Sequence, residues 1–308
     1  MPRVIDCEAA APLELGDVVA ALNDADWDPR DEESFAAMGP LLKGLAANRR
    51  FLADIAAAEL KDRCTRQSRE NRYSSQVIML HRASERYFIR ANFWPSERDS
   101  VVRTSGVSPF FYHVPHDHNF SFLTVGYLGP GYWSEYYEYD YEGVTGYPGE
   151  KVDLRFVERS RLEQGKVMLY RAHRDVHNQL PADEMSVSIN IMEASVRQPL
   201  LDQYRFDVTS CEIAGVLTKS STEALLALAA NSGDADARDV AESIAARHPS
   251  DRIRFSALKE LALAEPDVDA RLARLARGTA DPSGQVAALS AIELRRLEAH
   301  RAWLERPA

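Results

Sequence analysis

The sequence predicts a multidomain α+β protein, in which an antiparallel β-barrel is flanked by N-terminal helices and followed by a C-terminal α-helical domain. Three observations support this prediction. The 308 residues are enough for two or three domains, each with a core of its own. The spacing of hydrophobic residues changes along the chain from helical to strand-like and back to helical. Glycine and proline mark turns about every ten residues in the middle of the chain, as between short antiparallel strands.

Residues 1–70 form the predicted N-terminal helical segment. Their apolar side chains recur at intervals of three and four, which is the spacing of one helix face. These apolar residues are Phe35, Met38, Leu41, Leu42 and Leu45, followed by Leu52, Ile55 and Leu60. The acidic run Asp31-Glu32-Glu33 indicates a helix N-terminus, where negative charge is favoured. We expect this segment to brace the domain that follows.

Residues 71–218 form the predicted β-domain, since tyrosine, phenylalanine and valine become frequent there. The expected strands are Gln76 to His81, Tyr87 to Trp94, Asn119 to Tyr127, Tyr132 to Tyr141, Asp153 to Arg159, Lys166 to Tyr170, Val176 to Leu180 and Ser186 to Met192. The run Leu128-Gly129-Pro130-Gly131 predicts a hairpin turn, because glycine reaches positive φ and proline presets its own φ. A barrel or sandwich fits this pattern best.

Residues 219–308 form the predicted C-terminal domain, rich in alanine and leucine at helical spacing. Breaks at Asn231-Ser232-Gly233, His248-Pro249, Glu265-Pro266 and Asp281-Pro282 divide it into about five short helices. An offset of 33 residues aligns 253–261 with 286–294. This region resembles HEAT-like repeats, and an ordinary helical bundle is the alternative.

The charge and cysteine content argue against several classes of protein. The net charge is −10, and lysine and arginine are not clustered, so we expect no nucleic-acid partner. No run of roughly eighteen apolar residues occurs, so we expect no membrane span. The start of the chain also lacks an apolar leader, which predicts a cytoplasmic protein. Cys7, Cys64 and Cys211 are far apart and odd in number, which is typical of reduced thiols.

Histidines are concentrated in the predicted β-domain. Five of the eight lie there between residues 113 and 177, namely His113, His116, His118, His173 and His177. Along a strand, His116 and His118 share one face and Asp117 lies on the other. Two imidazoles on one face can bind one metal ion at about 2.0–2.2 Å. A third ligand has to come from another strand, and His177 and His173 are both candidates.

These residues resemble the motifs of the cupin superfamily, whose fold is a double-stranded β-helix barrel. The first cupin motif contains His-x-His, as in His116 and His118 here. The second contains a glycine, a short strand, a turn and a histidine, and Gly165, the turn at 171–175 and His177 match it in that order. The resemblance covers roughly residues 76–195 and implies a metal bound by His116, His118 and His177, with His173 as the alternative third ligand.

Two departures from the cupin pattern refine what the resemblance implies. Most metal-binding cupins place a glutamate four or five residues after the second histidine, where this chain has Phe122 and Leu123. The usual proline and glycine before the last histidine are also absent, which keeps His173 open. A site without the glutamate is similar to the three-histidine, cysteine dioxygenase-like cupins. Glu138 or Asp140, on the strand after the turn, is an alternative carboxylate ligand.

The resemblance implies a mononuclear non-haem iron oxygenase that oxidises a small molecule or a peptide. Fe(II) is the expected metal, with Cu, Mn, Ni and Zn as alternatives, since imidazole binds all of them. Tyr136, Glu138 and Arg171 are the candidate catalytic residues. The tyrosine is expected at the mouth of the pocket, and the arginine is expected to clamp an anionic group.

Two other functions stay open at this point. One is a metal-binding cupin isomerase or lyase without oxygen chemistry. The other is a helical-repeat interaction protein, whose C-terminal helices bind a protein partner while the barrel is not catalytic. A homodimer through barrel edges is a further expectation from the resemblance to cupins.

Overall fold

The computed structural model describes residues 2–8, 11–71, 73–74, 76–82 and 85–305. Met1 and residues 306–308 of the predicted C-terminal domain lie outside this range. The chain divides into two compact units. The first unit comprises Met1–Tyr141, Val152–Gln198 and Arg205–Cys211, and the second comprises Glu142–Lys151, Pro199–Tyr204 and Glu212–Ala308.

The first unit contains a six-stranded sheet and a three-stranded sheet, and all their strand pairs are antiparallel. In spatial order, the larger sheet consists of β1 (Arg3–Ile5), β7 (Val167–Tyr170), β4 (Phe122–Leu128), β9 (Ser186–Glu193), β3 (Tyr87–Trp94) and β2 (Val77–His81). The smaller sheet consists of β6 (Arg155–Arg161), β5 (Trp133–Glu138) and β8 (Asp175–Leu180). A two-stranded ribbon of β10 (Tyr204–Asp207) and β11 (Glu212–Val216) contains the boundary between the units.

All eight predicted strands overlap with strands of the structure, and this part of the prediction is confirmed. The closed barrel is not found among the described residues, because no ladder between named strands joins the two sheets. The N-terminal segment also contributes β1, a strand that its helical spacing did not predict. Its backbone pairs with β7, more than 150 residues further along, and a partner so distant leaves no local signal in the sequence.

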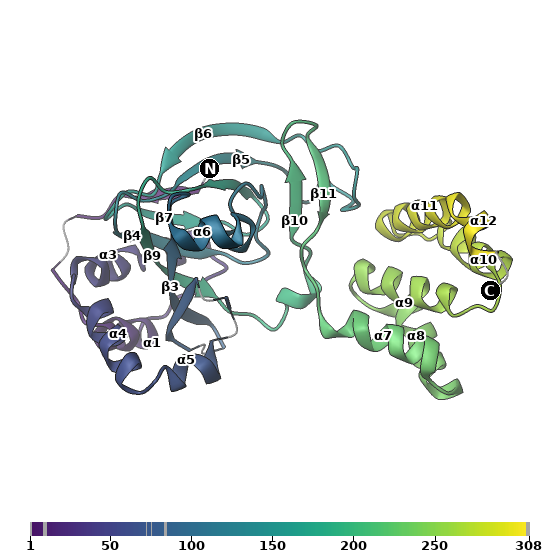
Figure 1. Ribbon diagram of the computed structural model, residues 1–308, viewed down its shortest axis with the longest axis horizontal. Helices are drawn as coiled ribbons and strands as arrows, with labels where there is room; N and C mark the ends of the chain where they lie inside the picture. The colour runs from purple at the N-terminus through teal and green to yellow at the C-terminus, as the bar shows by residue number, and fades with distance from the viewer. Residues whose placement is uncertain (1, 9–10, 72, 75, 83–84, 306–308) are drawn as a thin grey trace. The chain divides into compact units, whose positions relative to one another are not determined.

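Helices of the N-terminal segment cover one face of the six-stranded sheet (Figure 1). They are α1 (Leu15–Asp24), α2 (Glu32–Ala36), α3 (Gly39–Ala47), α4 (Phe51–Lys61) and α5 (Thr65–Glu70). The predicted N-terminus at the acidic run is confirmed, since the Asp31 side chain accepts a hydrogen bond from the Ser34 N–H at 2.7 Å and α2 begins at Glu32. A short α6 (Ser100–Ser105) and a 3₁₀ turn, η1 (Ser108–Phe110), follow β3.

Alternate side chains of β4 belong to two hydrophobic cores, one on each face of the larger sheet. Leu123 and Val125 are fully buried against the helices together with Leu42 and Leu45. Phe122, two residues before Thr124 on the opposite face, belongs to a second cluster that includes residues of β5 and β7. The inner face of the larger sheet therefore shares a core with strands of the smaller sheet, and the histidines lie on this side.

The run Leu128-Gly129-Pro130-Gly131 connects the two sheets and is not a hairpin turn. β4 pairs with β7 and β9, whereas β5 pairs with β6 and β8. Gly129 and Gly131 have φ values of +77° and +87°, as expected for a sharp change of direction. A Cβ on Gly131 would lie 1.9 Å from the carbonyl oxygen of Leu162, so only glycine fits there.

Burial predicts that two leucines of β4 contribute very differently to the free energy of unfolding. Leu123 is fully buried and Leu128 is 52% exposed. We expect Leu123→Ala to lower the free energy of unfolding by about 2–5 kcal/mol. Leu128→Ala, the same change on the same strand, is expected to alter it by less than about 0.5 kcal/mol. Urea denaturation of both variants measures the difference, and equal effects would contradict the assignment of this face as core.

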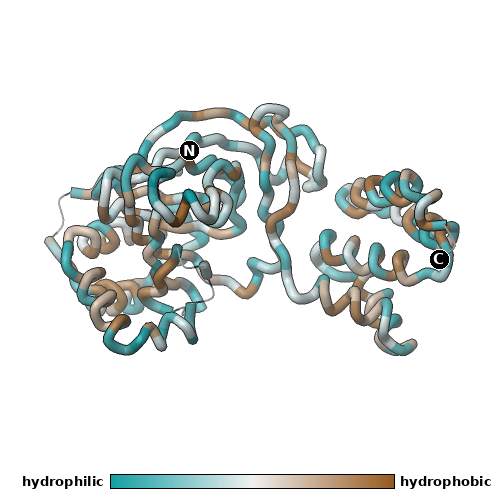
Figure 2. Tube along the Cα trace, viewed as in Figure 1, coloured by the Kyte–Doolittle hydropathy of each residue, from teal (hydrophilic) through white to brown (hydrophobic). Residues whose placement is uncertain are grey.

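The second unit is built mainly from helices. They are α7 (Ser221–Ser232), α8 (Ala235–Arg247), α9 (Asp251–Leu263), α10 (Val268–Gly278), α11 (Gly284–Ala299) and α12 (Arg301–Leu304). The segments aligned by the 33-residue offset lie in α9 and α11, and their HEAT-like stacking stays a prediction. Figure 2 shows hydrophobic and hydrophilic residues mixed along these helices. No helix in the described part of the chain has the length and hydropathy to cross a membrane.

Candidate metal centre

Two paired segments bring together three of the predicted histidines. His116 and His118 lie between η1 and β4, and His177 lies in β8. The N–H of His116 donates to the carbonyl of His177 at 3.1 Å, and the N–H of His177 donates to the carbonyl of His116 at 3.0 Å. The prediction of a regular strand at His116 was wrong, because this segment forms only isolated bridges and Pro115 has no N–H to extend a ladder.

The three imidazoles converge through their Nε2 atoms. The Nε2 atom of His177 lies 3.0 Å from Nε2 of His118 and 3.2 Å from Nε2 of His116. One ligand atom from each of the three residues lies within 4.8 Å of the others. Nitrogen atoms that bind one ion at about 2.1 Å with angles of 90–109° are about 3.0–3.4 Å apart. The spacing in this chain therefore fits a bound metal ion.

The surroundings of the imidazoles favour their neutral form, which metal ligation requires. His116 and His177 are 3% and 1% exposed. Burial lowers the pKa of both, and it lowers the pKa of His118, with added repulsion from the other two histidines. The Nδ1 atom of His116 lies 2.7 Å from the carbonyl of Val114, so an N–H there leaves the Nε2 lone pair free for a metal.

These lowered pKa values predict that the metal-free protein becomes less stable in mild acid. The unfolded chain takes up protons on these histidines below about pH 6.5, whereas the folded chain resists protonation until lower pH. Stability of the apoprotein should therefore be fully present above about pH 7.5 and fall as the pH drops through 6.5. Urea midpoints between pH 5 and 8 measure this slope. A His116→Asn/His177→Asn double variant should have a flatter profile, and an equal slope would refute the assignment.

The structure does not place His173, Glu138 or Asp140 in the histidine group. His173 has a φ of +58°, and its N–H donates to the carbonyl of His118 at 2.8 Å. Its ring lies 3.9 Å from the ring of Tyr141, measured between centroids. His173 thus contacts the backbone of a candidate ligand, while its ring packs elsewhere.

Glu138 and Arg171, two of the predicted catalytic residues, form an ion pair. Arg171 donates to Glu138 at 2.9 Å and to Asp175 at 2.6 Å, and Arg155 donates to Glu138 at 2.6 Å. Arg171 is thus held by carboxylates of the protein itself, which does not favour its predicted role as a clamp for a substrate anion. Catalytic roles for both residues stay predictions.

Tyr136, the third predicted catalytic residue, lies beside the histidines. It is fully buried and pairs with His177 across β5 and β8. Its hydroxyl lies 3.0 Å from the hydroxyl of Tyr170, whose ring is 5.0 Å from the His177 ring. Burial raises the pKa of Tyr136, so this phenol stays protonated at neutral pH. The structure thus puts a protonated phenol beside the candidate ligands.

Two residues that the sequence reasoning missed face the same side of the larger sheet. Arg90 in β3 and Thr124 in β4 both lie opposite Asn190 of β9 in the register. The Nε atom of Arg90 and the hydroxyl of Thr124 are buried without a hydrogen-bond partner. Arg90 forms no ion pair within the described part of the chain, and its guanidinium lies over the ring of Tyr73 at 4.7 Å. The charge of Arg90 also contributes to the lowered pKa of His118, which places it near the site.

A signal for Arg90 was present in the sequence. β3 reads Tyr-Phe-Ile-Arg-Ala-Asn-Phe-Trp, and an arginine in the middle of such a run is unusual for a strand with buried faces. A charge in this position calls for a partner. Among the described residues, Arg90 lies against the ring of Tyr73 and has no carboxylate within ion-pair distance.

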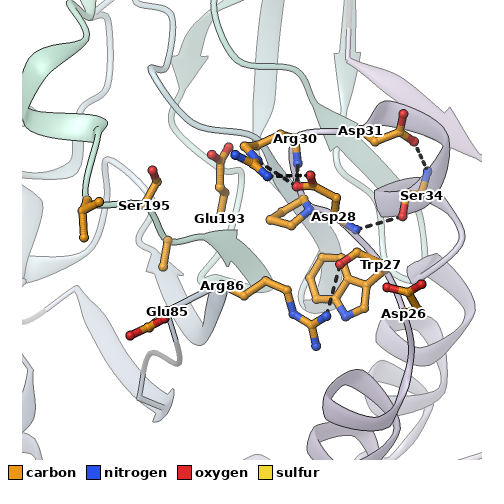
Figure 3. Close-up of a pocket in the computed structure, with 13 residues that line it drawn as sticks. Asp26, Trp27, Asp28, Arg30, Asp31, Ser34, Glu85, Arg86, Glu193 and Ser195 are labelled. Atoms are coloured by element: carbon orange, nitrogen blue, oxygen red, sulfur yellow. Dashed lines mark hydrogen bonds and ion pairs between the residues drawn. The ribbon is translucent and has the colours of Figure 1, made fainter.

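A surface pocket also lies between the N-terminal segment and the ends of β3 and β9 (Figure 3). Arg86 donates to the carbonyls of Leu22, Ala25 and Trp27 and lies 4.9 Å from the Trp27 ring. Arg30 pairs with Asp28 at 2.7 Å. Both cations are engaged by the protein, and the lining contains none of the three histidines. These contacts hold the loop between α1 and α2 against the strands.

The site and fold thus define an α+β protein with antiparallel sheets and a buried three-histidine group. No protein-family model matches the chain, and no curated protein matches it either. Among solved structures, it is similar to DMSP lyase DddQ from Ruegeria pomeroyi DSS-3, with 11% identity over 64% of this chain and 78% of that chain and a TM-score of 0.25.

Two further structures show a similar degree of likeness. The DMSP lyases RdDddP and RnDddQII are matched at 9% identity over 35% of this chain and 38% of that chain, with a TM-score of 0.21. The vicilin of Solanum melongena is matched at 11% identity over 41% of this chain and 32% of that chain, with a TM-score of 0.21. These likenesses are distant, and the function proposed below follows from the residues of this chain.

Proposed function

We propose that the protein is a cupin-type metalloenzyme that oxidises a small molecule or peptide with dioxygen. His116, His118 and His177 hold a divalent metal, Fe(II) in the first instance. The observation that carries the proposal is the convergence of three Nε2 atoms, 3.0 and 3.2 Å apart, in a buried and neutral environment. A divalent iron bound by three imidazoles keeps its full charge and has open positions for substrate and dioxygen.

Residues of the chain supply the rest of the site. Tyr136 and Tyr170 present protonated hydroxyls beside His177 and can donate hydrogen bonds to a substrate oxygen. Arg90 on β3 provides a cation whose Nε atom has no hydrogen-bond partner and which forms no ion pair among the described residues, which favours a substrate with a carboxylate or another planar anion. The buried side chains of Phe122 and Met168 belong to the same hydrophobic core and give the site an apolar wall.

A metal-dependent lyase or isomerase is the second candidate function. The cluster of buried phenols favours it, because such reactions move a proton without oxygen. Tyr132 belongs to this cluster, and burial raises its pKa to about 12. The two functions use the same metal site and differ in their need for dioxygen.

Metal content and oxygen reactivity test the proposal. Elemental mass spectrometry of the purified protein, before and after anaerobic iron reconstitution, should show near-stoichiometric metal. With Fe(II) bound, nitric oxide serves as a probe of an open position and should give the electron paramagnetic resonance signal of a high-spin iron nitrosyl. A protein that binds Fe(II) and nitric oxide but consumes no dioxygen favours the lyase or isomerase. A protein that binds no metal refutes both.

A further inference from the structure

Asp117 lies between two candidate ligands in the sequence, yet it is not part of the histidine group. Its side chain is fully buried, which is costly for a carboxylate unless hydrogen bonds compensate. In an extended segment, alternate residues point to opposite sides, so Asp117 faces away from the side on which His116 and His118 converge. The buried carboxylate therefore contacts residues that lie behind the candidate ligands, on the side away from their converging Nε2 atoms.

Tyr139 forms a short hydrogen bond with this carboxylate. Its hydroxyl donates to Oδ2 of Asp117 at 2.6 Å. The Tyr139 ring is 6% exposed and packs edge-on against Phe206, with ring centroids 5.0 Å apart. Tyr139 directly follows β5, the strand that pairs with β8 and so with His177. Packing thus holds the Tyr139 ring, and the neighbouring sheet holds its backbone.

His173 is the second residue that lies near the Asp117 carboxylate. Its Nδ1 lies 3.8 Å from the same Asp117 oxygen, and its N–H donates to the carbonyl of His118 at 2.8 Å. The backbone of the 116–118 segment is thus held at His116 by β8 and at His118 by His173. The Asp117 carboxylate, held by Tyr139, opposes rotation of the segment about its own axis.

We propose that Tyr139 is a positioning residue for the metal site. By holding Asp117, its hydroxyl sets the rotation of the segment and with it the directions of the His116 and His118 rings. Groups behind the ligands commonly tune affinity in this way, and their loss costs about 10–100-fold in metal binding. This inference rests on the proposed metal site, and it adds a residue that the His-x-His motif does not contain.

Tyr139→Phe tests the inference, since it removes one oxygen and keeps the ring. We expect Co(II) affinity to fall by about 10–100-fold and the visible spectrum of the Co(II) form to change. The thermal midpoint of the apoprotein should fall as well, because the buried Asp117 carboxylate loses a hydrogen bond. Tyr137→Phe is the matched control, because its ring packs against Phe156 and it should leave Co(II) affinity unchanged. Asp117→Asn retains an oxygen acceptor and should bind Co(II) more tightly than Asp117→Ala.

A double-variant cycle separates positioning from general destabilisation. If Tyr139 acts through Asp117, the Tyr139→Phe/Asp117→Ala double variant should bind Co(II) no more weakly than Asp117→Ala alone. Additive losses, or equal effects of Tyr139→Phe and Tyr137→Phe, would overturn the inference. Imidazole ¹⁵N shifts of the metal-free protein give a readout that does not depend on metal. If the wild type binds no metal but Tyr139→Phe still shifts the His116 and His118 signals, the proposed function fails and the positioning role stands.

Discussion

Replacing His177 with alanine is expected to abolish stoichiometric metal binding. His177 contributes the Nε2 atom that lies close to both other ligand atoms, at 3.0 and 3.2 Å, so its loss leaves two imidazoles and an open side. Two ligands do not hold a divalent ion as three do, and we expect affinity to fall by at least about 1,000-fold. Elemental mass spectrometry and titration with Co(II) measure the loss.

His173→Asn is the matched comparison, because asparagine tolerates the positive φ of this position better than most other residues with a side chain. It keeps the backbone N–H that donates to His118 and removes the imidazole. Metal should remain in this variant. Loss of metal in His173→Asn with retention in His177→Ala would show that His173 is the third ligand.

Replacing Arg90 with methionine is expected to abolish the response to small anions while metal binding persists. Charge-assisted hydrogen bonds to guanidinium contribute about 1.5–3 kcal/mol each, which corresponds to roughly 10–100-fold in affinity. Acetate, titrated into the Co(II) protein, should perturb the visible spectrum of the wild type and not that of Arg90→Met. Propylamine, a cation of similar size, should perturb neither protein.

The same substitution should raise the stability of the apoprotein by about 1 kcal/mol or more, since it removes a buried charge that lacks a carboxylate partner. Urea denaturation of the metal-free proteins checks this result. A destabilised Arg90→Met variant that still responds to acetate would mean that Arg90 serves the fold and not the substrate.

The strand pattern and the histidine triad were within reach of sequence reasoning, because both depend on local spacing. All eight predicted strands overlap with strands of the structure, whereas β1, β10 and β11 were not predicted, and His116, His118 and His177 converge as the motif implied. Local spacing does not determine which strands become neighbours. The run at 128–131 therefore suggested a hairpin, whereas β4 and β5 belong to different sheets.

The residues that the sequence reasoning missed owe their positions to long-range contacts. Arg90 was passed over because the pairing of β3 with β9 decides which side it faces. Tyr139 lies within the expected strand Tyr132 to Tyr141, and only the structure brings it to Asp117. Arg171 was predicted to bind a substrate anion because Glu138, which pairs with it, lies 33 residues away in the sequence and is near it only in the folded chain.

The paired hydrogen bonds between His116 and His177 bear on how the protein would take up a metal ion in a cell. They join the backbones of these two residues directly, so the fold itself sets the spacing at which the two imidazoles start. A metal ion bound there would meet ligands that the main chain brings together. A preassembled set of three imidazoles takes up divalent ions in the order of their intrinsic affinities, and copper or zinc outranks iron in that order. The identity of the bound ion would thus report the metal supply of the compartment in which the chain folds.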